Sequence, residues 1–99
     1  MLRAIPYHPD DDSVRIRLEG ELDMDTLPEL IAVLDSVGEA ARVVLDCEAL
    51  DFIDSTGVGY LLRWGLRRKA EGRELQLINL KPDIWETLNV LGFFAVLAQ

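Results

Sequence analysis

The sequence predicts an α/β layer fold in a single domain of residues 1–99. Segments with the alternating pattern of strands and segments with the helical period follow one another from residue 14 onward. The chain is long enough for one hydrophobic core, and it shows no internal repeat, low-complexity segment or linker. With 49% hydrophobic and 28% charged residues, its composition is that of a globular domain rather than a disordered chain.

Four segments have the pattern of strands: residues 2–7, the stretch around Val14, Ile16 and Leu18, residues 42–47, and residues 74–80. Pro6 confines the first segment to a sheet edge or ends it, because proline has no backbone N–H to donate. In the second segment the apolar residues alternate with charged ones, as in a half-buried strand. Residues 8–13 are turn material. Residues 93–97 are apolar and predict either a further strand or a short helix.

A helix is predicted from Thr26 to about Gly38. Thr26 and Glu29 have the spacing of a capping box, and Pro28 suits the first turn, where N–H groups lack helical partners. The apolar stripe of this helix is Leu27, Leu30, Ile31 and Leu34. Another helix opens at Pro82 and ends near Gly92. Its expected inner side carries Ile84, Trp85, Leu88 and Leu91.

The longest predicted helix runs from Ser55 to about Gly72, and either Asp54 or Ser55 is its N-cap. Helical spacing gives an inner face of Val58, Leu61, Leu62, Gly65 and Leu66, and an outer face of Tyr60, Arg63, Trp64 and Arg67. Tyrosine and tryptophan beside arginines are typical of protein interfaces. A solvated helix face, or a Trp64 covered by another segment of the same chain, explains the outer face as well.

Ser55 is the main functional candidate. Unpaired N–H groups and the helix dipole favour a negative group at a helix N-terminus, so a phosphate on Ser55 would be stabilised. The alternative is that Ser55 only caps the helix. Gly57 and Gly59 each cost roughly 1 kcal/mol relative to alanine within a helix. These glycines would allow close approach, either of a partner or of a neighbouring strand.

Charge is unevenly distributed along the chain. The net charge of −8 disfavours nucleic-acid binding. Residues 60–73 carry +4, and the rest of the chain carries −12. Acidic residues gather in residues 19–25 and 46–54, and each group follows a predicted strand and precedes a helix. If these strands are parallel, the two loops line one rim of the sheet, where ligand sites are common. Asp23 and Asp25 are therefore expected near Ser55.

The sequence gives little support for catalysis, a metal or another cofactor. Asp23, Asp25 and Thr26 resemble the nucleophile loop of haloacid-dehalogenase-type phosphatases, but those enzymes are considerably longer and need a downstream lysine. As a bare Mg²⁺ site, the two acids lack the substrate phosphates on which Mg²⁺ usually relies. His8 is the only histidine and has no partner ligand. There is no P-loop lysine and no serine-nucleophile elbow.

Cys47 is the only cysteine, so it cannot form an internal disulfide. Its apolar neighbours predict a small buried hydrophobic side chain. The N-terminal residues lack the apolar core of a signal peptide, and no apolar run approaches membrane-spanning length. The chain is therefore expected to be cytoplasmic, without a membrane partner.

Four segments, in order, resemble one family: Gly20-Glu21-Leu22-Asp23, Val43-Val44-Leu45-Asp46, Phe52-Ile53-Asp54-Ser55-Thr56-Gly57-Val58-Gly59, and residues 75–80 followed by Pro82 and Gly92. Together they are similar to the STAS domain of bacterial anti-anti-sigma factors (anti-sigma factor antagonists), over nearly the whole chain. The Asp-Ser-Thr-Gly segment is the most specific part. This resemblance implies a small mixed sheet of four to five strands flanked by helices.

The resemblance also implies a switch rather than an enzyme. Ser55 would be phosphorylated by an anti-sigma factor that is a serine kinase of the GHKL type, and a PP2C-type serine phosphatase would reset it. The unmodified form would sequester the anti-sigma factor, and the phosphorylated form would release it. The expected partner-binding residues are Asp23, Asp54, Ser55, Thr56, Gly57 and Gly59. Two alternatives stay open: Thr56 as a second acceptor, and a STAS module that never cycles phosphate, such as a regulatory subunit of a lipid-transport complex.

Overall fold

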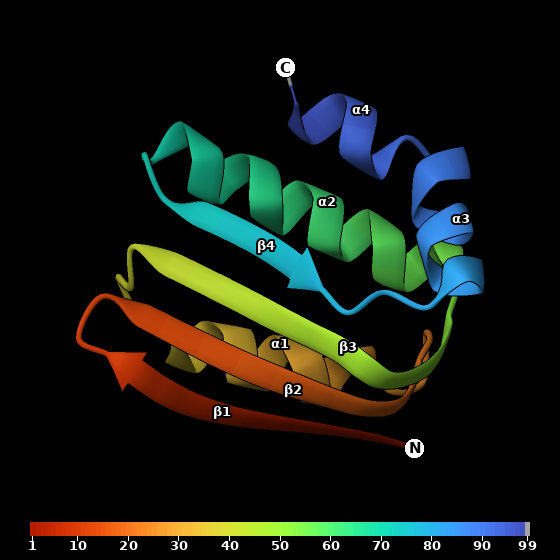
Figure 1. The fold of residues 1–99 in the computed structure, drawn as a ribbon, viewed down its shortest axis with the longest axis horizontal. Helices are drawn as coiled ribbons and strands as arrows, with labels where there is room; N and C mark the ends of the chain where they lie inside the picture. The colour runs from red at the N-terminus through yellow and green to blue at the C-terminus, as the bar shows by residue number, and fades with distance from the viewer. Residues whose placement is uncertain (99) are drawn as a thin grey trace.

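The alternating and helical segments of the sequence assemble into a sheet with helices packed against one face (Figure 1). The computed structural model describes residues 1–98. Its strands are β1 (Leu2–Asp10), β2 (Ser13–Leu22), β3 (Arg42–Ile53) and β4 (Glu74–Ile78), and its helices are α1 (Leu27–Ser36), α2 (Ser55–Ala70), α3 (Pro82–Val90) and α4 (Phe93–Leu97). The α/β class is confirmed, and the mixed sheet has four strands.

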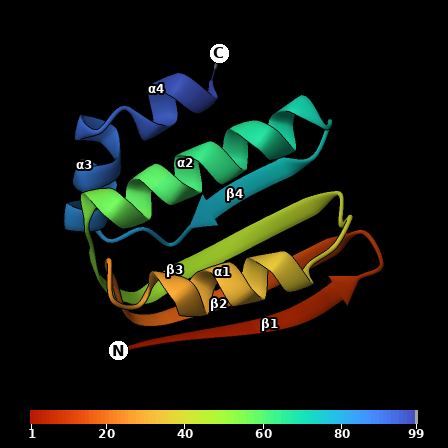
Figure 2. The same cartoon turned by 180° about the vertical axis from the view of Figure 1, so that it is seen from behind.

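The strand order is β1-β2-β3-β4, with β1 antiparallel to β2 and the other neighbours parallel. Pro6 lies in the edge strand β1, where proline is tolerated. Helix α1 joins β2 to β3, and α2 joins β3 to β4. Right-handed crossovers that step in one direction put both helices on the same face, and Figure 2 shows α1 and α2 together in front of the sheet. The carboxyl ends of β2, β3 and β4 therefore lie at one rim.

Apolar side chains on the helix-facing side of the sheet form the core. Val14, Ile16 and Leu18 are at most 2% exposed, which confirms the predicted alternation in β2. The residues that enclose them are equally buried: Val43, Leu45, Leu30, Leu34, Val58 and Leu61. Cys47 in β3 is 1% exposed, so it is the buried hydrophobic side chain that the sequence predicts. Burial raises the pKa of its thiol to about 12.

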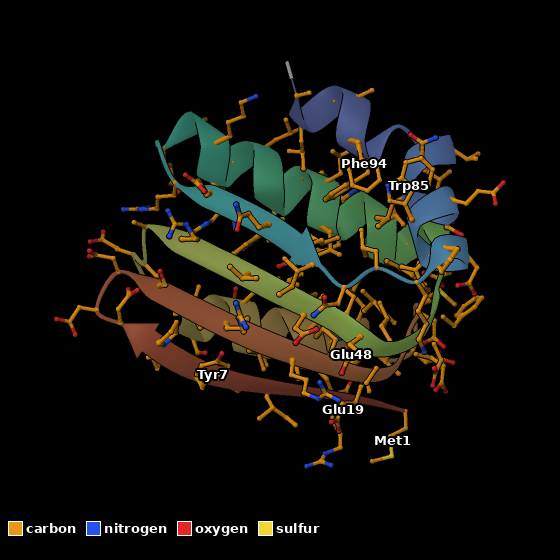
Figure 3. The ribbon with its side chains drawn as sticks, viewed as in Figure 1. Met1, Tyr7, Glu19, Glu48, Trp85 and Phe94 are labelled. Atoms are coloured by element: carbon orange, nitrogen blue, oxygen red, sulfur yellow. The ribbon has the colours of Figure 1, made fainter. Side chains whose placement is uncertain are left out.

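The other face of the sheet carries polar side chains, and none of the helices within residues 1–98 covers it (Figure 3). The Arg17 guanidinium lies between two acids, with Glu19 at 3.0 Å and Glu48 at 3.5 Å. The Arg15 guanidinium stands over the ring of Tyr7, 6.0 Å from its centroid. These pairs make this face of the sheet compatible with water. The apolar side chains of the alternating strands point to the opposite face, which the helices cover.

The limits of all four strands differ from the prediction. β2 runs from Ser13 to Leu22, so it also includes Ser13 from the predicted turn and residues 20–22 from the predicted loop. β1 continues to Asp10, so residues 8–10 belong to the strand instead of the turn. β3 continues to Ile53 instead of ending at residue 47, because two register shifts against β2 let it accommodate extra residues. β4 ends at Ile78 instead of residue 80, because Asn79 has a φ of 57°, which is left-handed and incompatible with a strand.

Helix α1 begins after Thr26 as predicted, but the predicted capping box is wrong. The Glu29 N–H, which would donate to the Thr26 hydroxyl in a capping box, instead donates to the Thr26 carbonyl at 3.0 Å. The Thr26 N–H donates to the Asp23 carboxylate at 3.0 Å and not to the Glu29 side chain. The hydroxyl instead donates to the Glu21 carbonyl at 2.8 Å and accepts from the Asp23 N–H at 3.0 Å. Thr26 therefore ties the end of β2 to the loop that follows it.

The buried face of α2 is rotated relative to the prediction. Trp64, predicted on the outer face, is 5% exposed, whereas Leu66, predicted on the inner face, is 38% exposed. The cause is that α2 is also covered on the side toward α1. On that side Arg68 is 3% exposed and donates to the carbonyl of Ala40, which follows α1, at 2.6 Å. Of the alternatives for Trp64, cover by another segment of the same chain is the one observed.

The apolar C-terminal segment forms the short helix α4, not a strand. In α3, Ile84 and Leu88 are buried as predicted, but Trp85 and Leu91 are 48% and 45% exposed. Trp85 lies where α4 meets α3, and its ring stacks on Phe94 with the two ring centroids 5.7 Å apart (Figure 3). Leu91 lies just beyond the last residue of α3, so it does not share the buried face of that helix.

Candidate functional site

Asp54 is the single residue between β3 and α2, at the rim of the sheet. The two predicted acidic loops are shorter than expected, because Glu19 and Glu21 lie in β2 and Asp46, Glu48 and Asp51 lie in β3. It directly precedes α2 and has an extended backbone, with φ −104° and ψ 177°. One carboxylate oxygen accepts from the Gly57 N–H at 2.8 Å, and the other accepts from the Met24 N–H at 3.0 Å. The Asp54 N–H donates to the Leu22 carbonyl at 3.1 Å. Asp54 is therefore the N-cap of α2, and it holds the loop after β2 against the start of that helix.

Ser55 is the first residue of α2 and is exposed. Because Asp54 supplies the cap, the Ser55 hydroxyl is not needed for that role. Within residues 1–98, no hydrogen bond engages this hydroxyl. The N–H groups of the first helical turn and the helix dipole favour an anion at this position. The hydroxyl can therefore be reached from solvent, at a position that tolerates negative charge.

Ser55 borders a shallow depression that the sequence analysis did not predict. The depression has a volume of about 540 Å³, and α3 and its last turn supply the rest of its lining: Asp83, Glu86, Thr87, Val90 and Leu91. Val90 is 74% exposed, so the surface beside Ser55 combines apolar side chains with two carboxylates. The order of the elements could have predicted that α3 lies beside Ser55. Helix α3 follows β4, a third parallel strand that ends at the same rim.

Asp23 lies in the loop that Asp54 holds. Its carboxylate accepts from the Asp25 N–H at 2.9 Å and from the Thr26 N–H at 3.0 Å, which forms an Asx turn. The Met24–Asp54 hydrogen bond places this loop beside the start of α2, as the rim argument predicts. Asp23 therefore shapes the rim through the backbone, and its direct contact with a partner stays a prediction.

The two glycines near the start of α2 have different surroundings. A Cβ added to Gly57 would lie 2.9 Å from Cγ of Leu22 and 3.3 Å from Cγ1 of Ile53. The close approach that Gly57 permits is therefore to the protein's own strands β2 and β3. A Cβ added to Gly59 would meet a guanidinium nitrogen of Arg63 at 3.4 Å, at the end of a flexible side chain. The surface at Gly59 is therefore open, and contact of a partner with Gly59 stays a prediction.

The depression beside Ser55 is lined by acidic, hydroxyl and apolar side chains. The depression beside Ser55 contains no histidine to activate the hydroxyl and no lysine or arginine to bind a phosphate. In the described residues, 1–98, no group of three or more His, Cys, Asp and Glu side chains is placed to hold a metal ion. None of the helices in that range is both long and apolar enough to span a membrane.

Residues 7–98 match the family model described as Mlab, STAS domain, which is nearly the whole chain. The chain belongs to the STAS domain family. This membership confirms the resemblance carried by the Gly-Glu-Leu-Asp and Asp-Ser-Thr-Gly segments. It also fits the mixed four-stranded sheet with helices against one face.

Relatives of this STAS chain are named as regulators. The anti-sigma F factor antagonist of Paenibacillus polymyxa is 27% identical over 85 residues, which cover 83% of this chain and 73% of that protein. BtrV of Bordetella bronchiseptica, named as a candidate anti-sigma factor antagonist, is 38% identical over 68 residues, which cover 69% of this chain. The matched part spans 57% of BtrV, little more than half of that relative.

The STAS chain is also similar to the anti-sigma factor antagonist SpoIIAA, which has been solved in two forms. With the unphosphorylated form the TM-score is 0.77 at 26% identity, and the match covers 92% of this chain and 82% of SpoIIAA. With the phosphorylated form from Bacillus the TM-score is 0.74 at 25% identity, and the match covers 94% and 86%. Both forms of that protein therefore have the fold of this chain.

Proposed function

We propose that this STAS protein is an anti-sigma factor antagonist whose affinity for an anti-sigma factor is switched by phosphorylation of Ser55. The observation that carries the proposal is the exposed Ser55 hydroxyl at the start of α2, where Asp54 already supplies the cap. Relatives named as anti-sigma factor antagonists support this assignment. The phosphorylated form of the similar protein SpoIIAA supports the proposed chemistry.

In this proposal the unmodified rim docks onto the anti-sigma factor. That partner is a serine kinase of the GHKL type and transfers phosphate to Ser55, which ends the complex. A PP2C-type serine phosphatase removes the phosphate and restores binding. Thr56, Gly59 and the apolar Val90 form the docking surface around the switch, since all three are accessible near the start of α2 or in the neighbouring depression.

The electrostatics of the rim give phosphorylation a local effect. A phosphate adds roughly −1.5 to −2 charges. The helix N-terminus stabilises these charges, so the fold should persist. Asp83 and Glu86 line the same depression, and no basic residue lines it to neutralise the phosphate. The modified rim therefore repels any acidic or closely packed surface that the unmodified rim would accept.

The decisive experiment is phosphorylation of the purified chain by the cognate kinase with ATP, followed by intact-mass and peptide mass spectrometry. We expect one phosphate per chain, and Ser55→Ala should abolish it. Thr56→Ala is the matched control, because it removes the adjacent exposed hydroxyl and should leave phosphorylation intact. Loss of the phosphate in Thr56→Ala but not in Ser55→Ala would reassign the acceptor to Thr56.

A second candidate is a STAS module that binds a larger complex through the same rim without a phosphate cycle. The description of the matching family model, Mlab, favours this candidate, because it names no anti-sigma factor. The kinase experiment separates the two. No phosphate on Ser55 with the cognate kinase, together with stable capture of the unmodified chain in a complex that contains no kinase, would support the second candidate.

A further inference from the structure

Arg63 and Arg67 are the two basic residues for which residues 1–98 supply no acid, backbone carbonyl or aromatic ring as a partner. The chain has 18 acidic and only ten basic residues, so partners are abundant. The other eight basic side chains all have one: acids for Arg3, Arg17, Arg42, Arg73 and Lys81, an aromatic ring for Arg15, and backbone carbonyls for Arg68 and Lys69. Two unpaired arginines four residues apart are therefore unexpected on this surface.

Arg63 and Arg67 line a depression of about 220 Å³ together with Tyr60 and Trp64, which we call the α2 arginine pocket. Trp64 is 5% exposed and forms a fixed wall, because the Arg68 guanidinium stands 5.0 Å from its ring centroid. Partial burial, reinforced by the charge of Asp35 on α1, raises the pKa of Tyr60, so its hydroxyl stays protonated and can donate. The pocket therefore offers two positive groups and a hydroxyl donor beside an aromatic wall.

The pocket continues the exposed side of α2 that starts at the rim. Thr56, Tyr60, Arg63 and Arg67 follow one another at intervals of four, three and four residues, which places them on one side of a helix. From Ser55 to Arg67 this side is roughly 18 Å long. Its two ends have opposite charge, since carboxylates surround Ser55 and arginines line the pocket.

We propose that the α2 arginine pocket binds an acidic segment of a protein partner, with carboxylates paired to Arg63 and Arg67. Guanidinium groups bind carboxylates through two parallel hydrogen bonds. Acids one turn apart on a helix match the spacing of the two arginines. An anionic membrane is a poorer occupant, because the net charge of −8 would be repelled by it. This inference does not depend on phosphorylation of Ser55.

The test uses the full chain and a helical alanine-based peptide that carries two pairs of glutamates four residues apart. The matched peptide has glutamine in place of each glutamate. Binding is followed by ¹⁵N NMR of the backbone amides and the arginine side-chain N–H groups. We expect the glutamate peptide to shift the signals of Tyr60, Arg63 and Arg67, and added salt to reverse the shifts. The glutamine peptide should leave them in place.

Variants of matched charge locate the site. The double variant R63Q/R67Q should weaken binding of the glutamate peptide by about tenfold or more, as expected for loss of at least one charged pair. The double variant R3Q/R42Q changes the net charge equally at two exposed arginines that already have acidic partners, so it should change affinity by less than about twofold. Ser55→Asp should leave peptide binding unchanged, which separates this inference from the proposed switch.

Several outcomes would overturn the inference. The first is the absence of any shift at the pocket, and the second is equal binding of the glutamine peptide. The third is an equal loss of affinity in R3Q/R42Q, which would show a general charge effect. Inorganic phosphate is titrated in parallel. If phosphate binds through Arg63 and Arg67 more tightly than the peptide does, the pocket is a phosphate site and the protein-segment proposal is wrong.

Discussion

Gly57 and Gly59 lie two residues apart in α2, yet one is enclosed and the other is open. Gly57→Ala should lower the free energy of unfolding by about 1–3 kcal/mol, because its Cβ would overlap the buried side chain of Leu22. Gly59→Ala should raise it by about 0.5–1 kcal/mol, because alanine favours the helix over glycine. Urea denaturation measures both values. A similar change in the two variants would contradict this contrast.

The same Gly59→Ala variant separates stability from binding. If a partner approaches α2 at this glycine, the variant should bind the anti-sigma factor more weakly although it is more stable. Unchanged affinity would show that Gly59 is not part of the docking surface.

Cys47 is expected to be inert in the folded protein. It is 1% exposed, and its pKa of about 12 leaves almost no thiolate at neutral pH. Titration with an aromatic disulfide reagent should release no colour from the folded chain, and one thiol per chain after denaturation with guanidinium. Rapid reaction of the folded chain would show that β3 opens or that the thiol is accessible.

Asp54 connects helix α2 to the loop after β2, so its contribution to stability extends beyond capping the helix. Asp54→Ala leaves the N–H groups of Gly57 and Met24 without their acceptors, so unfolding should become easier by about 1–3 kcal/mol. The matched control is Asp51→Ala, which removes an exposed acid paired with Lys81 and should cost less than about 1 kcal/mol. Denaturation curves compare the two. Equal losses would mean that Asp54 acts only as a surface charge.

Arg68 links the C-terminal half of α2, through hydrogen bonds, to the segment before β3 and to the start of β4. Its guanidinium is buried and donates to the carbonyls of Ala40 at 2.6 Å and Glu74 at 3.3 Å. Burial lowers the pKa of Arg68, but an arginine remains charged. Arg68→Ala should therefore cost about 2–4 kcal/mol of stability, and Arg63→Ala on the exposed side less than about 0.5 kcal/mol. Thermal and urea unfolding measure both, and similar costs would contradict the structural role.

Local patterns in the sequence predicted most of the elements, because periodicity depends on which side of a segment meets the core. The alternation around Ile16 and the helix start at Asp54 are such local signals. The failures involve neighbours that no local pattern records. Trp64 is buried because α2 is covered on a second side, and the capping box at Thr26 fails because the Thr26 hydroxyl bonds to Glu21 and Asp23 instead.

In the candidate site, too, local sequence predicted some features, and others depend on residues that are distant in the sequence. Asp54 and Ser55 are adjacent in sequence, so residue types alone predicted the helix start, but they left open which of the two is the N-cap. Val90 lies far along the chain, and only the parallel order of β3 and β4 brings α3 beside Ser55. The burial of Arg68 also could not be predicted from the sequence, because an arginine within a basic stretch ordinarily lies in solvent.

Across the whole molecule, charge is separated along α2. The rim around Ser55 is acidic, whereas the α2 arginine pocket lies toward the other end of the helix. A partner that covers both would place acidic side chains on the arginine pocket and pack closely against the rim, which would fix its orientation on the surface. Phosphorylation of Ser55 strengthens the acidic end only. In the proposed function, phosphorylation would therefore change one end of the docking surface and leave the fold and the other end as they are.

Ser55→Asp tests this separation of binding from folding in the intact protein. Because Ser55 is exposed at a helix N-terminus, the added charge should change the melting temperature by no more than about 2 °C. Affinity for the anti-sigma factor should fall more than about a hundredfold, as expected for a loss of about 3 kcal/mol, and calorimetric titration measures it. Gln76→Glu adds the same charge at an exposed position on β4 and should leave affinity unchanged. Wild-type affinity in Ser55→Asp, or an equal loss in Gln76→Glu, would contradict a local electrostatic switch.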